Sequence, residues 1–368
     1  MKILFVFGGK QKGGAERVIT NIANHLINNN EIYFLGLKKI DEFYSIDKKI
    51  KYYLMESETD YSRNFLVRNV KRLKKIKKIV KDINPNIIIS FSREQSYRIL
   101  LLNYFNKRKI IVSVRNDPRH EYTTLFEKII MQILYRRVNG FVFQTEDAKN
   151  FFPKKMRINS VIIPNPVNEK FLYVNKNVKK TKKIVSVGRL VNQKNHELLI
   201  DSFSKIADEF KEYKLIIYGS GELKKKLQNK INSLCLEKRI ILAGEVFNVK
   251  KSIEDAKLFV LSSNYEGMPN ALIEAMAIGL PVISTDCPCG GPRFLIKNNE
   301  NGILVPVNDI NKMVSAIKYI LSNYENANKM GREAMKIVKK LNPEKINKMW
   351  IEYINKIIES GDKLGKKK

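Results

Sequence analysis

Residues 259–284 read FVLSSNYEGMPNALIEAMAIGLPVIS, and this stretch predicts a strand, a turn, a helix and a second strand in quick succession. The apolar run Leu258–Leu261 is typical of a strand that is buried on both faces of a parallel sheet. Pro269 then marks a helix start, since proline is favoured in the first turn of a helix. Gly279 and Pro281 end that helix. A strand–helix–strand unit of this kind predicts an α/β fold.

The start of this helix is suited to binding a phosphate. A helix that begins near Pro269 leaves the backbone amides of its first residues, about Asn270 and Ala271, without intrahelical partners and with a partial positive charge. Glu274 lies one turn further on the same face, where its carboxylate could accept both hydroxyls of a ribose. Glu266 precedes the turn, and we expect it to face the group that the phosphates carry. The pattern predicts a nucleotide that carries a polyhydroxy group.

Both glutamates have a plainer interpretation as solvated surface residues. Residues 271–278 are otherwise entirely apolar, which predicts a helix that is buried all round. Burying a carboxylate in such a helix costs several kcal/mol unless it is paired. We therefore expect Glu274 to have a partner.

The same residues resemble a known enzyme family. Glu266, seven residues and then Glu274, within EGMPNALIEAMA, are similar to the signature of the retaining GT-B glycosyltransferases of glycosyltransferase family 4, or glycosyl transferases group 1. The resemblance spans nearly the whole chain. It implies a GT-B fold of the α/β class, with two Rossmann-like doubly wound domains that face each other across a cleft. It also implies that the second domain binds most of a nucleotide-sugar donor.

Length and composition fit this fold. A chain of 368 residues is expected to form two domains, and its 44% hydrophobic content is sufficient for two cores. No run of about eighteen apolar residues is present, so we expect no membrane span. The three cysteines give neither a disulfide framework nor the spacing of zinc ligands. We expect a cytoplasmic protein.

Strands and helices alternate twice along the sequence, which predicts two doubly wound domains. Residues 164–166, Pro-Asn-Pro, break the pattern, and the basic segment 168–183 is expected to be a structureless linker. We expect an acceptor-side domain at residues 1–167 and a nucleotide-sugar-binding domain at 168–342. The resemblance implies that a last helix, 343–360, crosses back to the first domain.

A glycine-rich loop follows the first predicted strand, in the sequence GGKQKGGAE at residues 8–16. A helix starts near its end, so Gly13 and Gly14 form a second candidate anion site. The signal is weak by itself because the loop lacks the dinucleotide-binding fingerprint. The resemblance implies that this loop lines the diphosphate site.

Polar residues follow the predicted strand 109–114, in Arg115-Asn-Asp-Pro-Arg-His120. Ligands of α/β proteins bind at the carboxyl ends of parallel strands. Many members of the family place a histidine at this strand end, whereas this chain has Arg115 there and His120 five residues later. The acceptor-side catalytic role is therefore open between Arg115 and His120, and His120 alone could be an ordinary surface residue.

Two cations follow the strand 183–187, in the sequence GRLVNQK at residues 188–194. Exposed cations five residues apart are commonly surface residues. The family pattern implies instead that Arg189 and Lys194 hold the diphosphate and stabilise its negative charge as it leaves. No Asp-x-Asp motif occurs, so we expect these residues and the helix start to replace a metal ion.

The resemblance extends the candidate site. Gly219 follows a strand and begins a helix, which suits close approach of a nucleoside, and Val246 corresponds to a segment whose backbone contacts the base. The expected catalytic residues are Glu266, Arg189, Lys194 and Arg115. The expected nucleotide-sugar-binding residues are Gly13, Gly14, Arg189, Lys194, Gly219, Val246, Glu266, Gly267, Met268, Asn270, Ala271 and Glu274.

The formal net charge of +31 is the largest anomaly of the composition. It permits nucleic acid, an anionic membrane surface or anionic substrates as partners, although a compositional bias of the gene also explains it. Residues 63–81 are predicted to form a helix with nine lysines or arginines and no acid. Such a helix is either a solvated helix that packs on the sheet or a basic face for anionic lipid at the inner membrane surface.

The most specific hypothesis is a retaining glycosyltransferase that needs no cofactor apart from its donor. Segments SVRNDP (113–118) and CGGPR (289–293) resemble those of enzymes that build bacterial capsules and lipid-linked glycans. The donor would be a UDP-hexose or UDP-N-acetylhexosamine, and the acceptor a glycan or a polyisoprenyl-linked glycan. The alternatives are a sugar-nucleotide epimerase of the same fold and a basic nucleic-acid-binding protein, although the sequence contains no nucleic-acid-binding module. The sugar, acceptor, linkage and oligomeric state stay open.

Overall fold

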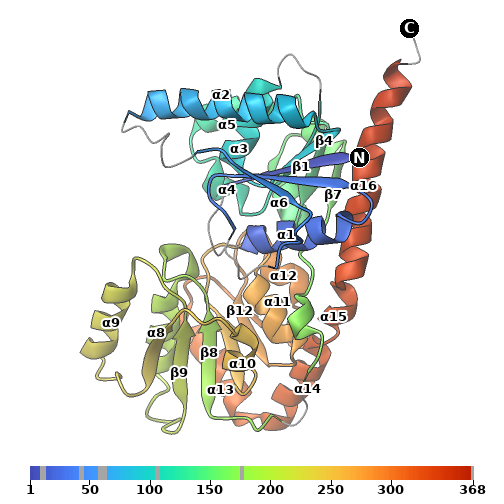
Figure 1. Cartoon of the computed structure of the whole chain (residues 1–368). Coiled ribbons are helices and arrows are strands. Elements are labelled where there is room, and N and C mark those ends of the chain that lie inside the picture. The colour runs from blue at the N-terminus through green and yellow to red at the C-terminus, as the bar shows by residue number, and fades with distance from the viewer. Residues whose placement is uncertain (9–13, 41–44, 57–63, 104–107, 175–177, 366–368) are drawn as a thin grey trace. The chain divides into compact units, whose positions relative to one another are not determined.

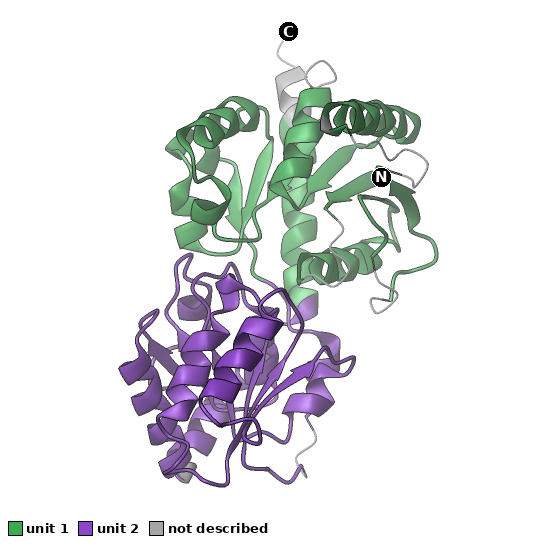
Figure 2. Cartoon of the chain, turned by 90° about the vertical axis from the view of Figure 1, so that its left-hand side faces the viewer, with its two compact units in different colours: residues 1–164, 344–368 green, residues 165–343 purple. Residues whose placement is uncertain are grey.

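The computed structural model describes residues 1–8, 14–40, 45–56, 64–103, 108–174 and 178–365. The chain divides into two compact units, which Figure 2 shows in different colours. Unit 1 consists of Met1–Pro164 and Glu344–Lys368, and unit 2 of Asn165–Pro343. The first unit ends inside the Pro-Asn-Pro break of residues 164–166, and the C-terminal helix belongs to it.

Unit 1 is built on a parallel sheet with strand order β3-β2-β1-β4-β5-β6-β7. The chain runs outward from β1 to β3 and then continues on the other side of β1, so the strand order reverses between β1 and β4. Helices α2, α3 and α5 lie on one face of this sheet (Figure 1). The strands are β1 Lys2–Phe7, β2 Glu31–Gly36, β3 Lys51–Leu54, β4 Ile87–Ser90, β5 Lys109–Ser113, β6 Gly140–Phe143 and β7 Ser160–Ile162. The helices are α1 Gly14–Leu26, α2 Phe65–Ile83, α3 Arg93–Leu102, α4 Pro118–Glu121, α5 Leu125–Tyr135, α6 Glu146–Phe151, α7 Lys154–Arg157 and α16 Pro343–Gly365.

Helix α16 completes the core of unit 1. The indole of Trp350 is fully buried and stacks on Phe91, with ring centroids 5.7 Å apart. The hydroxyl of Tyr353 donates a hydrogen bond of 2.6 Å to the carbonyl of Asn159. Ile354 and Ile357 are also buried, so an apolar face of the helix packs into the unit.

Two helices of unit 1 expose several apolar side chains. On α2, Leu66 and Val70 are 72% and 52% exposed, and the buried residues are concentrated in the second half of the helix. On α5, Ile129 is 47% and Ile133 59% exposed, while Met131 is buried. An apolar side chain on these two helices therefore does not by itself mark the side that faces the core.

Unit 2 repeats the same architecture with strand order β10-β9-β8-β11-β12-β13, all parallel. The strand order reverses between β8 and β11. The strands are β8 Lys183–Val187, β9 Lys214–Tyr218, β10 Ile240–Gly244, β11 Leu258–Leu261, β12 Val282–Thr285 and β13 Ile303–Val305. The helices are α8 His196–Ser204, α9 Lys224–Ser233, α10 Val249–Ile253, α11 Asn270–Ala277, α12 Gly291–Leu295, α13 Ile310–Ser322, α14 Tyr324–Ala334 and α15 Ile337–Lys340. Two short 3-10 turns, η2 Glu169–Phe171 and η3 Asn192–Lys194, are also present. The prediction of two Rossmann-like doubly wound α/β domains is thus confirmed.

The described parts of the segment 168–183, residues 168–174 and 178–183, belong to unit 2 and are not the structureless linker that its composition indicated. Asn168 caps η2 by accepting a hydrogen bond of 3.0 Å from the amide of Lys170, and Phe171 is buried. Further along, the hydroxyl of Thr181 donates to the carbonyl of Asp255 at 3.1 Å. Side-chain capping and one buried aromatic ring fix these parts of the segment. The basic composition, on which the prediction of a linker rested, indicates neither feature.

None of the helices within the described ranges is both long enough and apolar enough to cross a membrane.

Candidate functional site

The candidate site of unit 2 lies where the order of its strands reverses. In a doubly wound sheet, ligands bind outside the carboxyl ends of the strands at this point. The loop after β8 carries Arg189 and Lys194, and the loop after β11 carries Glu266. Because β8 and β11 are hydrogen-bonded neighbours, the two loops emerge side by side. The fold therefore brings together residues that are more than seventy positions apart in sequence.

Lys194 and Glu266 form an ion pair at this point. The ammonium nitrogen of Lys194 lies 2.5 Å from Oε1 of Glu266, and the two side chains are 16% and 7% exposed. The hydroxyl of Ser263 donates a second hydrogen bond, of 2.6 Å, to the same oxygen. A charged pair that is so little exposed is held in one geometry, because either partner alone would be a buried, uncompensated charge.

Backbone contacts lock the two loops against each other. The amide of Asn264 donates to the carbonyl of Gln193 at 2.8 Å, and the side-chain amide of Gln193 donates to the carbonyl of Tyr265 at 3.1 Å. The exposed Arg189 donates to the side-chain oxygen of Gln193 at 3.3 Å. Gln193 therefore connects Arg189 to the loop that carries Glu266.

The neighbouring β9 and β10 loops are joined at the same edge of the sheet. The amide of Gly219 donates to the carbonyl of Gly244 at 2.7 Å. Gly219 has a φ of +141°, and a Cβ there would lie 2.0 Å from the carbonyl oxygen of Gly188. Only glycine fits this position, because the β8 and β9 loops touch through their backbones. Val246 follows two residues after Gly244 and is partly buried.

Helix α11 begins beside the ion pair, with Pro269 as its N-cap residue. The side-chain amide of the buried Asn165 donates to the carbonyl of Met268 at 3.2 Å and to Oδ1 of Asn270 at 2.8 Å. A Cβ on Gly291 would lie 1.8 Å from the carbonyl oxygen of Gly267, so the turn is also held from the α12 side. The turn that precedes the helix is thus fixed on two sides.

The remaining nucleotide-site candidates of unit 2 lie on α11. Ala271 is partly buried in its first turn, and Glu274 is 4% exposed, one turn further along. The helix begins at Asn270, so the amides of its first turn have no intrahelical acceptor. The sequence-predicted anion site therefore lies on the same loop–helix junction as Glu266.

Sequence reasoning missed three residues that organise this site, namely Ser263, Gln193 and Asn165. Ser263 lies in the stretch 259–284 and Gln193 in the motif GRLVNQK, but nothing in the spacing of these residues shows what they contact. The position of Asn165 could have indicated its role, because a residue between two prolines has little freedom to adjust its backbone.

His196 is buried behind Lys194, at the start of α8. Its Nε2 lies 3.3 Å from the carbonyl oxygen of Arg189, and the ring is 3% exposed. Burial, reinforced by the charge of Lys194, lowers the pKa of His196 to about 4. The ring is therefore neutral at pH 7 and adds no charge to the site.

The candidate site residues of unit 1 lie in different environments. Gly13 lies outside the described residues, and Gly14 is the exposed first residue of α1. The guanidinium carbon of Arg115 lies 4.8 Å from the ring centroid of Phe91 and 5.5 Å from that of Trp350. Burial lowers the pKa of Arg115 to about 9, so it stays charged at pH 7. His120 is exposed on α4.

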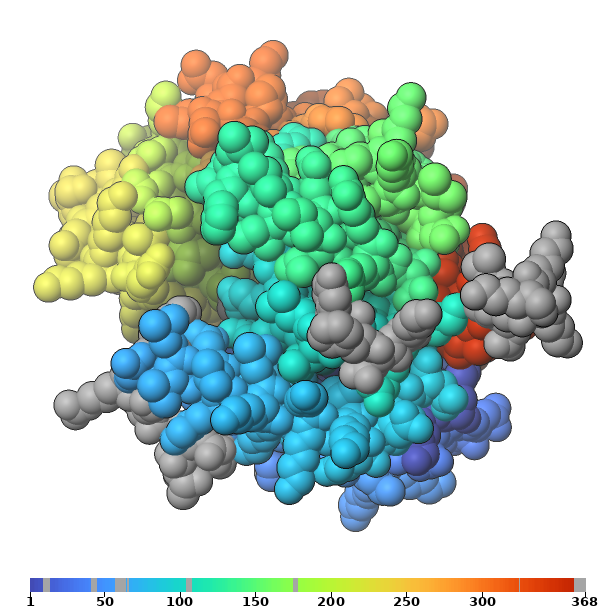
Figure 3. Space-filling model, turned by 90° about the horizontal axis from the view of Figure 1, so that it is seen from above, coloured from blue at the N-terminus to red at the C-terminus, as the bar shows by residue number. Residues whose placement is uncertain are grey.

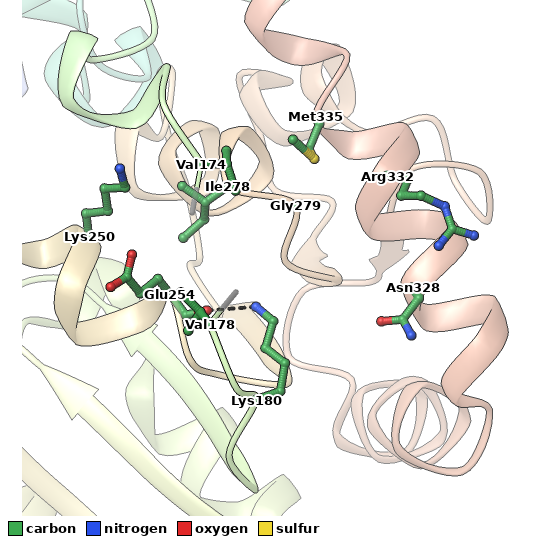
Figure 4. Close-up of a pocket in the computed structure, with 10 residues that line it drawn as sticks. All are labelled: Val174, Val178, Lys180, Lys250, Glu254, Ile278, Gly279, Asn328, Arg332 and Met335. Atoms are coloured by element: carbon green, nitrogen blue, oxygen red, sulfur yellow. Dashed lines mark hydrogen bonds between the residues drawn. The ribbon is translucent and has the colours of Figure 1, made fainter. Parts of the chain in front are cut away.

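A cavity of about 180 Å³ elsewhere in unit 2 is not part of this site. Figure 4 shows that Lys180 and Gly279 line it, and these residues precede β8 and β12, at the amino ends of the strands. The ammonium of Lys180 donates to the carbonyl of Glu254 at 2.7 Å, and that of Lys250 to the carbonyl of Tyr173. Two of its cations are thus already engaged by backbone oxygens.

The arrangement in unit 2 can stabilise negative charge. A cation held by a buried carboxylate, a second exposed cation and a helix start all lie around the loops that follow β8 and β11. Preorganised positive groups of this kind act most strongly on charge that develops during a reaction.

Comparison with known proteins agrees with this interpretation. Residues 168–337 match the model of the family described as Glycosyl transferases group 1. An uncharacterised glycosyltransferase of Methanocaldococcus jannaschii is 35% identical over 251 residues, a match that covers 62% of each chain.

A second relative matches almost from end to end. It is the N-acetylgalactosamine-N,N'-diacetylbacillosaminyl-diphospho-undecaprenol 4-alpha-N-acetylgalactosaminyltransferase of Campylobacter jejuni, 29% identical over 357 residues, or 89% of this chain and 93% of the relative. Among solved structures, Anabaena HepE in complex with UDP-glucose superposes with a TM-score of 0.83 over 97% of this chain and all of that one, at 16% identity. The GT-B fold expected from the sequence is confirmed.

Proposed function

The chain belongs, through residues 168–337, to the glycosyl transferases group 1, and from this we propose that it is a retaining glycosyltransferase that uses a UDP-sugar. The observation that carries the proposal is the Lys194–Glu266 ion pair beside the start of α11. The names of two relatives support the donor and acceptor: one transfers N-acetylgalactosamine to an undecaprenyl diphosphate-linked sugar, and HepE was solved with UDP-glucose. We propose a UDP-hexose or UDP-N-acetylhexosamine donor and a glycan or polyisoprenyl-linked acceptor, in the synthesis of a bacterial surface polysaccharide.

Each donor group has a proposed partner in unit 2. The diphosphate contacts Arg189, Lys194 and the first amides of α11, around Asn270 and Ala271. Glu274 accepts the ribose hydroxyls. The backbone near Gly219 and Val246 contacts the base, and Gly267 and Met268 shape the turn around the diphosphate. In unit 1, Gly13 and Gly14 line the diphosphate.

Lys194 has a second proposed role, in the chemical step. During transfer, the bond between the anomeric carbon and the diphosphate oxygen breaks, and a bond to the acceptor oxygen forms with the same anomeric configuration. The proton of the acceptor hydroxyl passes to the departing diphosphate oxygen. The diphosphate keeps the electron pair of the broken bond, so its negative charge grows. Lys194 and Arg189 stabilise this charge, and no metal ion is required. Glu266 fixes the ammonium and faces the sugar.

The acceptor side is proposed to use Arg115, with His120 as the alternative. Arg115 is held by two aromatic rings and remains charged at neutral pH, so it can attract an anionic acceptor. Arg115→Gln and His120→Gln should be compared at saturating donor. The variant that raises the acceptor KM or lowers kcat identifies the residue that acts.

We further propose that the protein works in the cytoplasm against the inner face of the membrane. Lys71, Lys74 and Lys78 of α2 are exposed, and each cation near an anionic surface contributes roughly 1 kcal/mol. Replacing Lys71, Arg72, Lys74, Lys75 and Lys78 with Gln should weaken the salt-sensitive part of binding to anionic vesicles and leave donor binding unchanged. Equal sedimentation of this variant and the wild type would exclude a lipid role for α2. We expect no nucleic acid as a partner.

A product assay tests the central proposal. The protein is incubated with UDP-glucose, UDP-galactose or either UDP-N-acetylhexosamine, with and without a short-chain polyisoprenyl diphosphate-linked sugar, in the presence of EDTA. We expect acceptor-dependent release of UDP and a longer glycolipid. Conversion of the donor without an acceptor would indicate an epimerase instead, and activity that EDTA abolishes would contradict the metal-free mechanism.

A further inference from the structure

Exposed apolar side chains are concentrated on three helices of unit 1. Among the described residues, eight of the fifteen large apolar side chains that are exposed lie on α2, α3 and α5. Helix α3 contacts both of the others, so the three form one layer on the sheet. Figure 3 views this layer from outside, with α2 in light blue and α5 in teal. Exposed apolar side chains that gather on one layer usually mark a binding site.

Helix α5 carries the centre of this surface. Leu125, Phe126, Ile129 and Ile133, here called the apolar stripe of α5, are 74%, 70%, 47% and 59% exposed. At 100° per residue they occupy one side of the helix. Met131 and Tyr135 are buried, so α5 is apolar on both its inner and its outer side. A soluble helix that only covered a sheet would have a polar outer side.

Specific contacts hold α5 in this orientation. Thr124 and Glu127 form a capping box at its start. The hydroxyls of Tyr122 and Tyr135 are 2.8 Å apart, and the ring of Tyr135 packs at 5.4 Å from that of Phe141 on the sheet. The helix cannot rotate to bury its stripe without breaking these contacts, so the stripe is presented outward as a fixed feature.

Most exposed charges of α2, α3 and α5 are positive, and the exposed acids are Asp82 of α2 and Glu94 of α3. Glu127 is the only acid on α5, and it accepts hydrogen bonds from the backbone of Thr124 and from Arg93, at 3.0 and 2.9 Å. Lys128 is exposed on the same helix, and Arg136 is exposed at its C-cap. Helix α2 adds Leu66, Val67 and Val70 as exposed apolar residues and Lys71, Lys74, Lys77, Lys78 and Lys81 as exposed cations.

We infer that the apolar stripe of α5 inserts into the acyl region of an anionic leaflet while the surrounding cations contact its head groups. A bilayer surface combines an apolar interior with anionic head groups, and this face complements both. A second copy of the chain would instead bring like charges together in a protein of net charge +31. Weak insertion and electrostatic attraction together give the two signals that stable peripheral binding requires. The inference deepens the proposed function and rests on it, since a polyisoprenyl-linked acceptor resides in that leaflet.

The first experiment reports insertion directly. The chain has one tryptophan, Trp350, which is fully buried, so its emission gives a constant background. Phe126→Trp places a second tryptophan on the stripe, and Tyr173→Trp places one at an 80%-exposed position of unit 2 as a matched control. With vesicles of phosphatidylcholine and phosphatidylglycerol, we expect a blue shift and quenching by brominated acyl chains for Phe126→Trp only. Equal responses of the two variants, or none, would overturn the inference.

The second experiment separates insertion from charge. Leu125→Gln, Phe126→Gln, Ile129→Gln and Ile133→Gln are combined in one variant and compared with Tyr173→Gln in vesicle sedimentation at 0.1 and 1 M salt. We expect the wild type to keep measurable binding at 1 M salt and the combined variant to bind at least tenfold more weakly at both. Unchanged binding would refute insertion. A dimeric wild type that this variant converts to monomer would show that the stripe is a self-association surface instead.

An activity measurement distinguishes this inference from the proposed function. The combined variant should extend a short-chain, water-soluble acceptor as fast as the wild type but lose at least tenfold activity on acceptor in vesicles. If neither protein extends any acceptor while the vesicle results hold, the proposed function fails and the lipid contact remains. Loss on the soluble acceptor as well, with an unchanged melting temperature, would contradict a purely membrane role of the stripe.

Discussion

Lys194→Met should destabilise unit 2 as well as impair the reaction. The substitution keeps most of the volume of the side chain but removes the charge that compensates Glu266, whose side chain is only 7% exposed. The hydroxyl of Ser263 still donates to Oε1 of Glu266 in the variant, so the carboxylate keeps one partner. The variant therefore leaves a buried anion that is hydrogen-bonded but no longer paired.

The size of this effect follows from the geometry. At 2.5 Å and an effective dielectric constant of about 20, the Coulomb attraction is roughly 7 kcal/mol, and desolvation of the two ions cancels several kcal/mol of it. Removal of one partner of a buried pair typically costs about 3–5 kcal/mol. We expect about 3 kcal/mol for Lys194→Met because Ser263 retains part of the compensation.

A double-mutant cycle isolates the pair. Urea unfolding of the wild type, Lys194→Met, Glu266→Gln and the double variant should give a coupling free energy of about 2–3 kcal/mol. Lys183 and Asp255, 2.6 Å apart in the same unit but 29% and 23% exposed, provide a matched control. We expect about 1 kcal/mol or less there, because solvent screens the more exposed pair. A coupling at Lys194 no larger than at Lys183 would refute the argument that burial makes this pair strong.

Three further predictions concern the donor, the chemical step and pH. Glu274→Ala should weaken UDP binding, measured by calorimetry, about tenfold or more, because a hydrogen bond to a charged group contributes roughly 1.5–3 kcal/mol; unchanged affinity would exclude the ribose role. Arg189→Ala should lower kcat more than it raises the donor KM, since charge on the diphosphate grows in the transition state; a change in KM alone would make Arg189 a binding residue only. His196, with its pKa lowered from 6.5 to about 4, should make stability fall as the pH falls from 6.5 through 4, by about 3 kcal/mol in total, because the unfolded chain takes up the proton first. The melting temperature of His196→Gln should depend less on pH over that range than that of the wild type. An equal pH dependence of the two melting temperatures would contradict the assignment.

The sequence predicted the sheets well because buried parallel strands have a strong signature. Runs such as Ile3–Phe7 and Leu258–Leu261 are apolar throughout, and each forms a central strand. Strand β3, Lys51–Leu54, was not predicted, because it is a partly exposed edge strand with charged and polar neighbours in sequence. Burial on both faces thus made these central strands recognisable.

The site was predicted as a set of residues but not as an arrangement. Glu266 and Lys194 had separate expected roles, and their pairing depends on β8 and β11 being neighbours. The pairing of strands that are distant in sequence is a property of topology, which no local pattern contains. The outward stripe of α5 has a related cause, since apolar residues lie on two sides of this helix and the sequence does not indicate which side packs on the sheet.

The place of α16 in unit 1 also determines the order in which the protein can mature on the ribosome. Phe91 is synthesised early, but the indole that covers it belongs to Trp350, which follows all of unit 2. Trp350 follows Phe91 by 259 residues (350 − 91), so at roughly 5–20 residues per second about 13–52 s separate these two events. The N-terminal half of this chain therefore stays incomplete while the C-terminal half already has all of its own residues, so nascent unit 1 is where a chaperone would be needed.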